Sequence, residues 1–197
     1  MRVLLLLSCA AAFAPPLERG SAPLAIGARV ADFTFQDVDG QRHSLYGYKD
    51  RKAIVIVFVG TECPIANLYL PRLVELHKQY AAKGVQFLAI NSNDQDSAAA
   101  VAAHARERKL PLTVAKDADH KAADALGARR TPEAFLLDSR HVIRYRGRID
   151  DQYGYTYRRP APTRSELKDA IEELLAGKTI TTPETEVRGC LIGRDKR

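Results

Sequence analysis

The chain has 197 residues, of which 46% are hydrophobic and 27% charged, and its formal net charge is +6. This length fits one globular domain of about 150 residues with tails, and such a domain can bury a core without disulfide staples. The basic excess is mild, and neither a nucleic-acid motif nor an aromatic stacking platform accompanies it. We therefore expect no nucleic-acid partner.

The N-terminal residues are typical of an export signal. A basic start at Arg2 precedes an apolar stretch over 3–7 and small residues over 10–14. We therefore assign residues 1–22 to a signal peptide or export segment and expect an exported protein, either periplasmic or secreted. The four residues that end at Cys9 also loosely match a bacterial lipobox. Lipidation of Cys9, which we favour less than simple cleavage, would make the protein a membrane-anchored lipoprotein.

Apolar periodicity predicts alternating strands and helices in the remainder of the chain. In chain order we expect strands over 30–36 and 42–45, a buried strand over 53–59, a helix over 66–83, a strand over 85–90, a helix over 97–109, a strand over 111–115, a helix over 119–126, strands over 133–138 and 141–146, and a helix over 166–176 capped by Thr163 or Ser165. This order predicts an α/β fold, with a central mixed β-sheet flanked by helices and an N-terminal β-hairpin. We place the domain at 23–177 and a C-terminal tail without periodic pattern at 178–197.

Cys63 is the residue with the clearest chemical signal. It follows the apolar strand over 53–59 and immediately precedes Pro64, which suits the first turn of a helix. Cys63 would then lie at a helix N-terminus, where free backbone N–H groups favour a thiolate. A buried structural cysteine is the alternative. The agreement of strand, proline and helix favours a reactive thiol.

The chain resembles thioredoxin-fold redoxins, and specifically the peroxiredoxin-like (AhpC/TSA-like) subgroup of exported bacterial proteins. The resemblance spans about 26–177 and rests on the segment 31–33, the run that ends at Cys63-Pro64, Thr131-Pro132, the segment 147–152 and the pair Gly189-Cys190. It implies a thioredoxin-like fold and thiol-based redox chemistry. We expect no cofactor and no metal at such a site.

Thr131-Pro132 matches the position at which thioredoxin-like folds place a cis proline beside the reactive cysteine. A cis X-Pro bond is rare and holds a tight local shape. It would leave the backbone of Thr131 available to bind an extended substrate by strand addition. An ordinary trans proline that opens the following strand is the alternative.

The sequence around Cys63 departs from the active-site patterns of both thioredoxins and peroxiredoxins. Ala66 stands where thioredoxins have a second cysteine, so no local disulfide can form. Gly60 stands where peroxiredoxins have a threonine or serine, three residues before the cysteine. A peroxidase must hold the peroxide oxygens by hydrogen bonds. Thr61 and an arginine beside Pro132, such as Arg130, are candidates for this role, although a surface arginine is an equal alternative.

Cys190 is the second thiol of the mature chain. It lies in the tail, 127 positions after Cys63 (190 minus 63), and this separation does not forbid pairing. A tail packed across the domain would let Cys190 act as the resolving thiol. A free thiol, an intermolecular disulfide and a static structural bridge remain alternatives.

Two functions follow. The first is a thiol oxidoreductase, either a peroxidase or a thiol-disulfide exchange protein. Its catalytic residues would be Cys63, Cys190, Thr61 and Pro132, with Thr131 and Arg130 contacting the substrate. Its partners would be a peroxide or a disulfide-containing protein and a dithiol protein reductant. The second is a non-catalytic redoxin that docks proteins or binds a soft metal such as copper, although the histidines show no ligand spacing.

Overall fold

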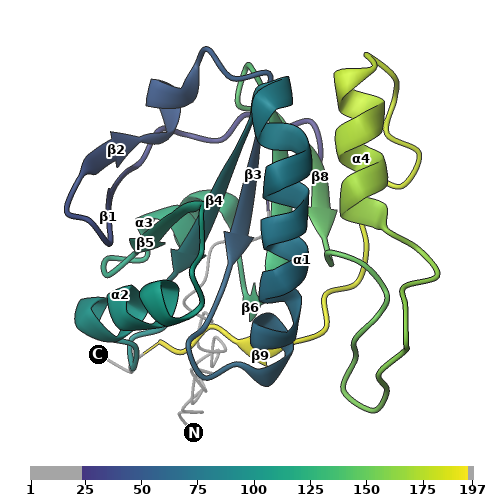
Figure 1. Cartoon of the computed structure of the whole chain (residues 1–197). Helices are drawn as coiled ribbons and strands as arrows, with labels where there is room; N and C mark the ends of the chain where they lie inside the picture. Colours follow the sequence, from purple (N-terminus) through teal and green to yellow (C-terminus); the bar gives the residue numbers. More distant parts are fainter. Residues whose placement is uncertain (1–23, 195–197) are drawn as a thin grey trace, which may run out of the picture.

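The computed structural model describes residues 24–194, so the expected export segment and Cys9 lie outside the described part. In chain order the elements are β1 (Thr34–Asp37), β2 (Arg42–Ser44), the 3-10 turn η1 (Leu45–Tyr48), β3 (Ala53–Phe58), α1 (Pro64–Tyr80), the 3-10 turn η2 (Ala81–Lys83), β4 (Val85–Asn91), α2 (Ala98–Glu107), β5 (Thr113–Lys116), α3 (Lys121–Leu126), β6 (Arg130–Thr131), β7 (Glu133–Asp138), β8 (Ile143–Gly147), α4 (Glu166–Leu175) and β9 (Cys190–Leu191). Their order confirms the predicted α/β fold (Figure 1).

A mixed sheet forms the centre of the molecule. Within residues 24–194 it has seven strands, in the order β2-β1-β5-β4-β3-β7-β8. β3 is an interior strand, parallel to β4 and antiparallel to β7, and every residue of β3 is buried. Its uninterrupted apolar sequence, Ala53 to Phe58, is what burial on both faces requires. β1 and β2 form the predicted N-terminal hairpin.

Helices cover both faces of the sheet, as predicted. Side chains of α1, α2 and α4 pack on one face together with Val55 and Val57 of β3. The other face carries Ile54 and Ile56 and is covered by α3 and the N-terminal segment. This alternation follows from the period-two geometry of a strand. Each face therefore has its own apolar core.

Some predicted boundaries are wrong, each for a local reason. The strand expected from residue 30 begins at Thr34, because Val30 bonds instead to the carbonyl of His141 outside the sheet ladder. The helix expected to end at 83 ends at Tyr80, and its last turn is the 3-10 turn η2. Ser165 lies at the N-cap of α4 without a side-chain cap, and Thr163 bonds to Asp151, so neither residue caps that helix.

The C-terminal tail has no periodic sequence pattern, yet part of it forms a short strand. β9 pairs antiparallel with β6, next to the N-terminal end of α1 (Figure 1). Before β9 the tail runs beside β8, where the Arg146 N–H donates to the Pro183 carbonyl at 3.0 Å and the Thr185 N–H donates to the Arg146 carbonyl at 3.1 Å. The tail therefore crosses the end of the sheet that carries Cys63.

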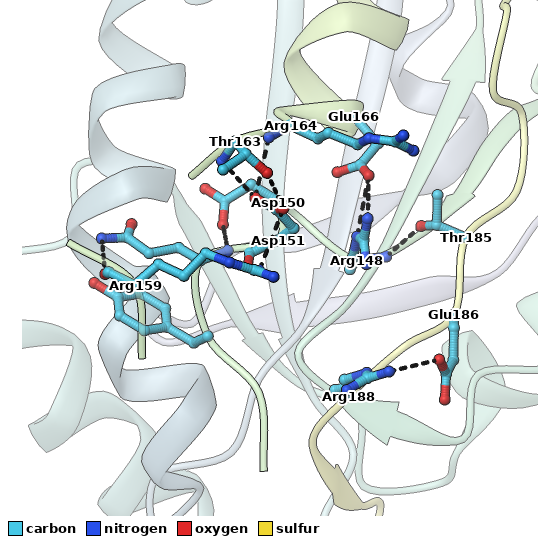
Figure 2. A network of polar contacts seen from close by, with 12 residues as sticks. Arg148, Asp150, Asp151, Arg159, Thr163, Arg164, Glu166, Thr185, Glu186 and Arg188 are labelled. Atoms are coloured by element: carbon cyan, nitrogen blue, oxygen red, sulfur yellow. Dashed lines mark hydrogen bonds and ion pairs between the residues drawn. The ribbon is translucent and has the colours of Figure 1, made fainter. Parts of the chain in front are cut away.

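Polar contacts fasten the tail and the segment between β8 and α4 to the domain (Figure 2). The Arg148 guanidinium forms an ion pair with Glu166, and the Arg148 N–H donates to the Thr185 hydroxyl at 3.0 Å. Asp151 accepts from the Thr163 N–H at 2.7 Å and is paired with Arg159 at 3.3 Å. Across residues 24–194, every helix is too short or too polar to cross a bilayer.

Candidate functional site

Cys63 lies at the N-cap of α1, as predicted. The buried strand β3 delivers the chain to this end of the sheet, and Pro64 occupies the start of the helix. The Ala66 N–H donates to the Cys63 Sγ at 3.5 Å. The side chain is 5% exposed. The sulfur is thus held at a helix N-terminus, where unpaired backbone N–H groups favour an anion.

Two polar side chains hold the loop that precedes Cys63. The buried carboxylate of Asp96 accepts from the Thr61 hydroxyl at 2.5 Å and from the Thr61 N–H at 3.1 Å. The Asn67 side-chain amide donates to the carbonyls of Thr61 at 2.8 Å and Cys63 at 3.1 Å. The hydroxyl proton of Thr61 therefore points to Asp96 rather than to the sulfur. In this geometry Thr61 anchors the loop before Cys63 instead of donating to the Cys63 sulfur.

The structure explains the glycine at position 60. A Cβ built there would lie 2.6 Å from Asn93 Nδ2, which is closer than side chains tolerate. The same Cβ would lie 3.3 Å from the Cys63 Cβ and 3.4 Å from the Thr131 Oγ1. A threonine at position 60 is thus excluded by Asn93. The hydroxyl of Thr131 lies close to where such a side chain would begin.

Thr131 contacts Cys63 through its backbone and its side chain. The Thr131-Pro132 peptide bond is cis, which confirms the prediction. The Cys63 thiol donates to the Thr131 carbonyl at 3.0 Å. The Thr131 hydroxyl is buried and, among the described residues, makes no hydrogen bond of regular geometry. It is therefore free to turn toward the sulfur when the thiol ionises.

The tail brings Cys190 to Cys63. Cys190 is paired with Thr131 in the β6–β9 ladder, and the carbonyl of the same Thr131 accepts from the Cys63 thiol, so the two cysteines are neighbours at the site. Both cysteines are free thiols in the described structure; Cys63 is buried and Cys190 exposed. The sequence left open whether the tail reaches the site, and the structure places the two thiols together.

Electrostatics differ between the two thiols. Burial opposes ionisation of Cys63, but the ionised sulfur would accept from the Cys190 thiol, the Thr131 hydroxyl and the backbone N–H groups of Ala66 and Cys190, and these donors outweigh burial and lower the pKa of Cys63. Partial desolvation of the Cys190 sulfur and the neighbouring Cys63 sulfur raise the pKa of Cys190 to about 11. Cys63 is therefore the thiol that ionises first.

Arg130 does not contact Cys63 in the described structure. Its guanidinium donates to the Tyr155 hydroxyl and to the Gly189 carbonyl, both at 2.9 Å. The Tyr155 hydroxyl also donates to the Gly189 carbonyl at 2.8 Å and accepts from the Gly189 N–H at 3.0 Å. Arg130 and Tyr155 thus hold the residue before Cys190.

Sequence reasoning missed Asp96 and assigned no seating role to Tyr155 or Gly189. Asp96 follows a polar run at the end of β4, and the parallel pairing of β3 and β4 brings that run to the Cys63 loop. That placement is readable from sequence, but the choice of Asp96 is not. The exposed, tyrosine-rich sequence around Tyr155 gave no indication of its contact with Gly189.

Residues 24–194 contain no group of three or more histidine, cysteine, aspartate or glutamate side chains arranged to hold a metal ion. His77, on the helix that follows Cys63, packs its ring edge-to-face on Phe87 with centroids 5.7 Å apart. The soft-metal hypothesis therefore has no third ligand near the two thiols in the described part of the chain.

Comparison with known proteins agrees with this geometry. The thiol-disulfide oxidoreductase ResA of Bacillus thuringiensis strain Al Hakam is 28% identical over 141 residues, which cover 70% of this chain and 80% of ResA. The crystal structure of a hypothetical protein from Sinorhizobium meliloti 1021 superposes with a TM-score of 0.81 at 30% identity, covering 91% of this chain and 100% of that one.

An exposed lipoprotein thioredoxin of Streptococcus pneumoniae strain TIGR4 superposes with a TM-score of 0.56 at 23% identity, over 75% of this chain and 99% of that one, and so shows the thioredoxin-like fold. The model of the AhpC/TSA family matches residues 26–146, which include Cys63 and the Thr131-Pro132 bond. This protein, with Cys63 at the start of α1 in a thioredoxin-like fold, belongs to the AhpC/TSA family.

Proposed function

We propose that the protein is a thiol oxidoreductase in which Cys63 attacks the substrate and Cys190 resolves the product. The position of Cys190 opposite Thr131, the residue whose carbonyl accepts from the Cys63 thiol, carries this proposal. The AhpC/TSA family match and the ResA relative support the same chemistry. The first thiol is buried at a helix N-terminus, and the second lies on a tail strand with free access from solvent.

Cys63 begins the reaction as a thiolate. With a hydroperoxide, the thiolate attacks one peroxide oxygen, the O–O bond breaks, and the second oxygen leaves as an alcohol or water after taking a proton. Cys63 is then a sulfenic acid. With a disulfide, the thiolate attacks one sulfur, the S–S bond breaks, and the other sulfur leaves as a thiolate. The lowered pKa of Cys63 supplies the nucleophile in both cases.

Cys190 completes the oxidative half of the cycle. Its sulfur attacks the Cys63 sulfur and forms the Cys63–Cys190 disulfide, while the sulfenic oxygen leaves as water, or the bound substrate leaves as a thiol. Two thiol groups have then been oxidised, and one peroxide or one disulfide has been reduced. Ala66 cannot supply this second thiol, whereas the tail can.

A dithiol protein would return the enzyme to its reduced form. Solvent access and leaving-group chemistry both favour attack of the reductant on the Cys190 sulfur. Cys190 is exposed and Cys63 buried, and the thiol of lower pKa is the better leaving group. The reductant would therefore attack the Cys190 sulfur and release Cys63 as a thiolate.

Thr131 is the residue we propose to stabilise the reacting sulfur. Its buried hydroxyl is available beside Cys63, whereas the Thr61 hydroxyl is bonded to Asp96. A hydroxyl donor at this position would favour the thiolate and hold the departing peroxide oxygen. Pro132 follows Thr131 directly, and the Thr131 carbonyl accepts from the Cys63 thiol at 3.0 Å.

Thiol mapping tests the two-cysteine cycle. The reduced protein is treated with one equivalent of hydrogen peroxide, alkylated and analysed by mass spectrometry. We expect a Cys63–Cys190 disulfide in the unmodified chain, loss of turnover in Cys63→Ser, and a single round of reaction in Cys190→Ser. Sustained turnover by Cys63→Ser would contradict the proposal. Two alkylated thiols in the unmodified chain would instead favour a non-catalytic redoxin.

Location outside the cytosol also remains a proposal. A disulfide-forming pair is stable in an oxidising compartment, and the N-terminal sequence is typical of an export signal. Cell fractionation of the tagged chain, with and without residues 1–22, tests this assignment. Retention of both forms in the cytosol would contradict it.

A further inference from the structure

β6 is the edge at which an extended protein substrate would reach Cys63. It immediately precedes Pro132, and the Thr131 carbonyl accepts the Cys63 S–H. A peptide that adds as a strand to such an edge is bound through backbone hydrogen bonds. A disulfide in that peptide would then lie beside the Cys63 sulfur. The described structure has a strand at this edge already, and that strand belongs to the same chain.

We propose that tail residues Gly189–Ile192 act as an internal occupant of the strand-addition edge. In the reduced protein, Cys63 would then react with small oxidants, and extended protein chains would be excluded until the tail leaves β6. This inference rests on the proposed function, because it concerns the substrates of the same thiol.

The pairing of the tail uses the backbone groups that a peptide would need. β9 is antiparallel to β6, with Arg130 opposite Leu191 and Thr131 opposite Cys190. The ladder continues beyond β9, where the Ile192 N–H donates to the Arg129 carbonyl at 2.9 Å. A second strand cannot pair with the same backbone groups while β9 is in place.

The approach of the tail to β6 is closer than a side chain permits. A Cβ on Gly189 would lie 2.0 Å from the Thr131 carbonyl oxygen and 3.1 Å from the Pro132 Cδ. The first atom belongs to the backbone and cannot move aside without disturbing the site. Glycine at position 189 is therefore needed for the tail to seat, and a larger residue there would displace it.

Contacts on both sides of Cys190 fix the tail. On one side, Tyr155 bonds to both the N–H and the carbonyl of Gly189. On the other side, Ile192 is 8% exposed and packs into the core beside α3. The Gly193 N–H then donates to the Asn93 side chain at 2.9 Å. The strand is thus built into the fold.

Size separates the two classes of substrate. An extended chain needs several residues of free edge, whereas a small oxidant has to reach one sulfur atom. The test therefore compares two disulfides that undergo the same exchange at Cys63. One is 2-hydroxyethyl disulfide; the other is an extended ten-residue peptide whose cysteine is joined to 2-mercaptoethanol. In each, the Cys63 thiolate attacks one sulfur, the S–S bond breaks, and the other sulfur leaves as a thiolate.

The experiment uses the full chain with Cys190→Ser, so that the mixed disulfide on Cys63 persists. We expect the peptide to react at least about tenfold more slowly than the small disulfide, because strand addition is blocked. Adding Gly189→Val should raise the ratio of peptide rate to small-disulfide rate at least about fivefold. The control Gly47→Ala should leave this ratio unchanged, because a Cβ at Gly47 meets no atom within 4 Å.

Equal rate ratios in the Gly189→Val and Gly47→Ala proteins would overturn the inference. If Gly189→Val fails to fold by circular dichroism, Tyr155→Phe takes its place, since it removes the hydroxyl that holds Gly189. It should change the ratio in the same direction, and an unchanged ratio would overturn the inference equally. Failure of Cys63 to react with either disulfide or with peroxide in any variant would instead refute the proposed function, and with it this inference.

Discussion

Cys63 combines burial, which disfavours a charge, with a set of hydrogen-bond donors that favours one. The donors come from three separate parts of the chain: the first turn of α1, the Thr131 hydroxyl and the tail residue Cys190. Because these donors outweigh burial, the pKa of Cys63 is lowered while the pKa of Cys190 is raised. The two cysteines thereby acquire different chemical roles.

Replacing the Thr131 hydroxyl tests its part in this balance. In Thr131→Val we expect the pKa of Cys63 to rise, because one donor to the thiolate is removed. A hydrogen bond to a charged group contributes roughly 1.5 kcal/mol, so alkylation of Cys63 by iodoacetamide should slow up to about tenfold at a pH below the pKa. The pH profile of alkylation measures this shift in Cys190→Ser, where Cys63 is the reporting thiol. Thr131→Ser should retain the rapid reaction, and an unchanged profile in Thr131→Val would rule out the role.

The close approach of Asn93 explains why position 60 is a glycine. In Gly60→Ala the new methyl group would collide with the buried Asn93 amide, which bonds to Asp96 at 3.2 Å. Overpacking of this kind costs roughly 1–3 kcal/mol in unfolding free energy. Urea unfolding measures the loss, with Gly47→Ala as the matched control because that position has open space. Equal stability of the two variants would contradict the steric reason given for glycine at position 60.

At the scale of elements, loops from different parts of the chain meet at one end of the sheet. The carboxyl ends of parallel strands are where such sheets place reactive groups. β3 delivers Cys63 there, and β4 delivers the segment with Asn93 and Asp96. The segment between β8 and α4 contributes Tyr155. Asp151 lies near the start of this segment and accepts from the Thr163 N–H near its end, so it joins the two ends of the segment.

Asp151 makes the stability of this segment dependent on pH. Burial disfavours its charge, but hydrogen bonds from Thr163 and Arg164 lower its pKa to about 2. A depressed folded-state pKa contributes stability above the ordinary value of 3.8, and that contribution is lost as pH falls toward 2. In Asp151→Asn, unfolding free energy should be lower at neutral pH and should fall less steeply between about pH 4 and 2.

Thermal or urea unfolding over this pH range measures the slope. Asp119→Asn is the matched control, since Asp119 is exposed and paired with exposed Lys121. Other carboxyl groups with lowered pKa, such as Asp37 and Asp96, keep part of the slope in both variants. If Asp151→Asn and Asp119→Asn show the same slope, Asp151 is not a source of the pH dependence.

At the scale of the whole molecule, the tail adds a second cysteine, Cys190, beside the Cys63 site of the redoxin domain. It contacts β8 through Pro183 and Thr185, pairs with β6 through Cys190, and ends the described chain at an ion pair between Arg194 and Asp124 at 2.7 Å. Oxidation to a Cys63–Cys190 disulfide would close a loop of 127 positions (190 minus 63).

Such a crosslink should stabilise the oxidised protein. It restricts the unfolded chain, and a loop of this length is associated with roughly 5 kcal/mol on the chain-entropy scale. We expect a higher urea midpoint for the oxidised protein than for the same protein in a thiol reductant. Cys190→Ser should unfold identically in both conditions. An equal midpoint for oxidised and reduced wild-type protein would show that the disulfide strains the fold or does not form.

The sequence by itself determined the α/β class, the burial of β3 and the place of Cys63 before α1. These features follow from local signals: a continuous apolar run, a proline at the first helical turn and helical periodicity. The tertiary structure alone decided that Cys190 lies opposite Thr131 beside Cys63, that Thr61 bonds to Asp96, and that Tyr155 and Gly189 seat the tail. Those contacts join residues from 34 to 127 positions apart (189 minus 155; 190 minus 63). No local pattern encodes them, because they depend on how the sheet brings distant loops to one edge.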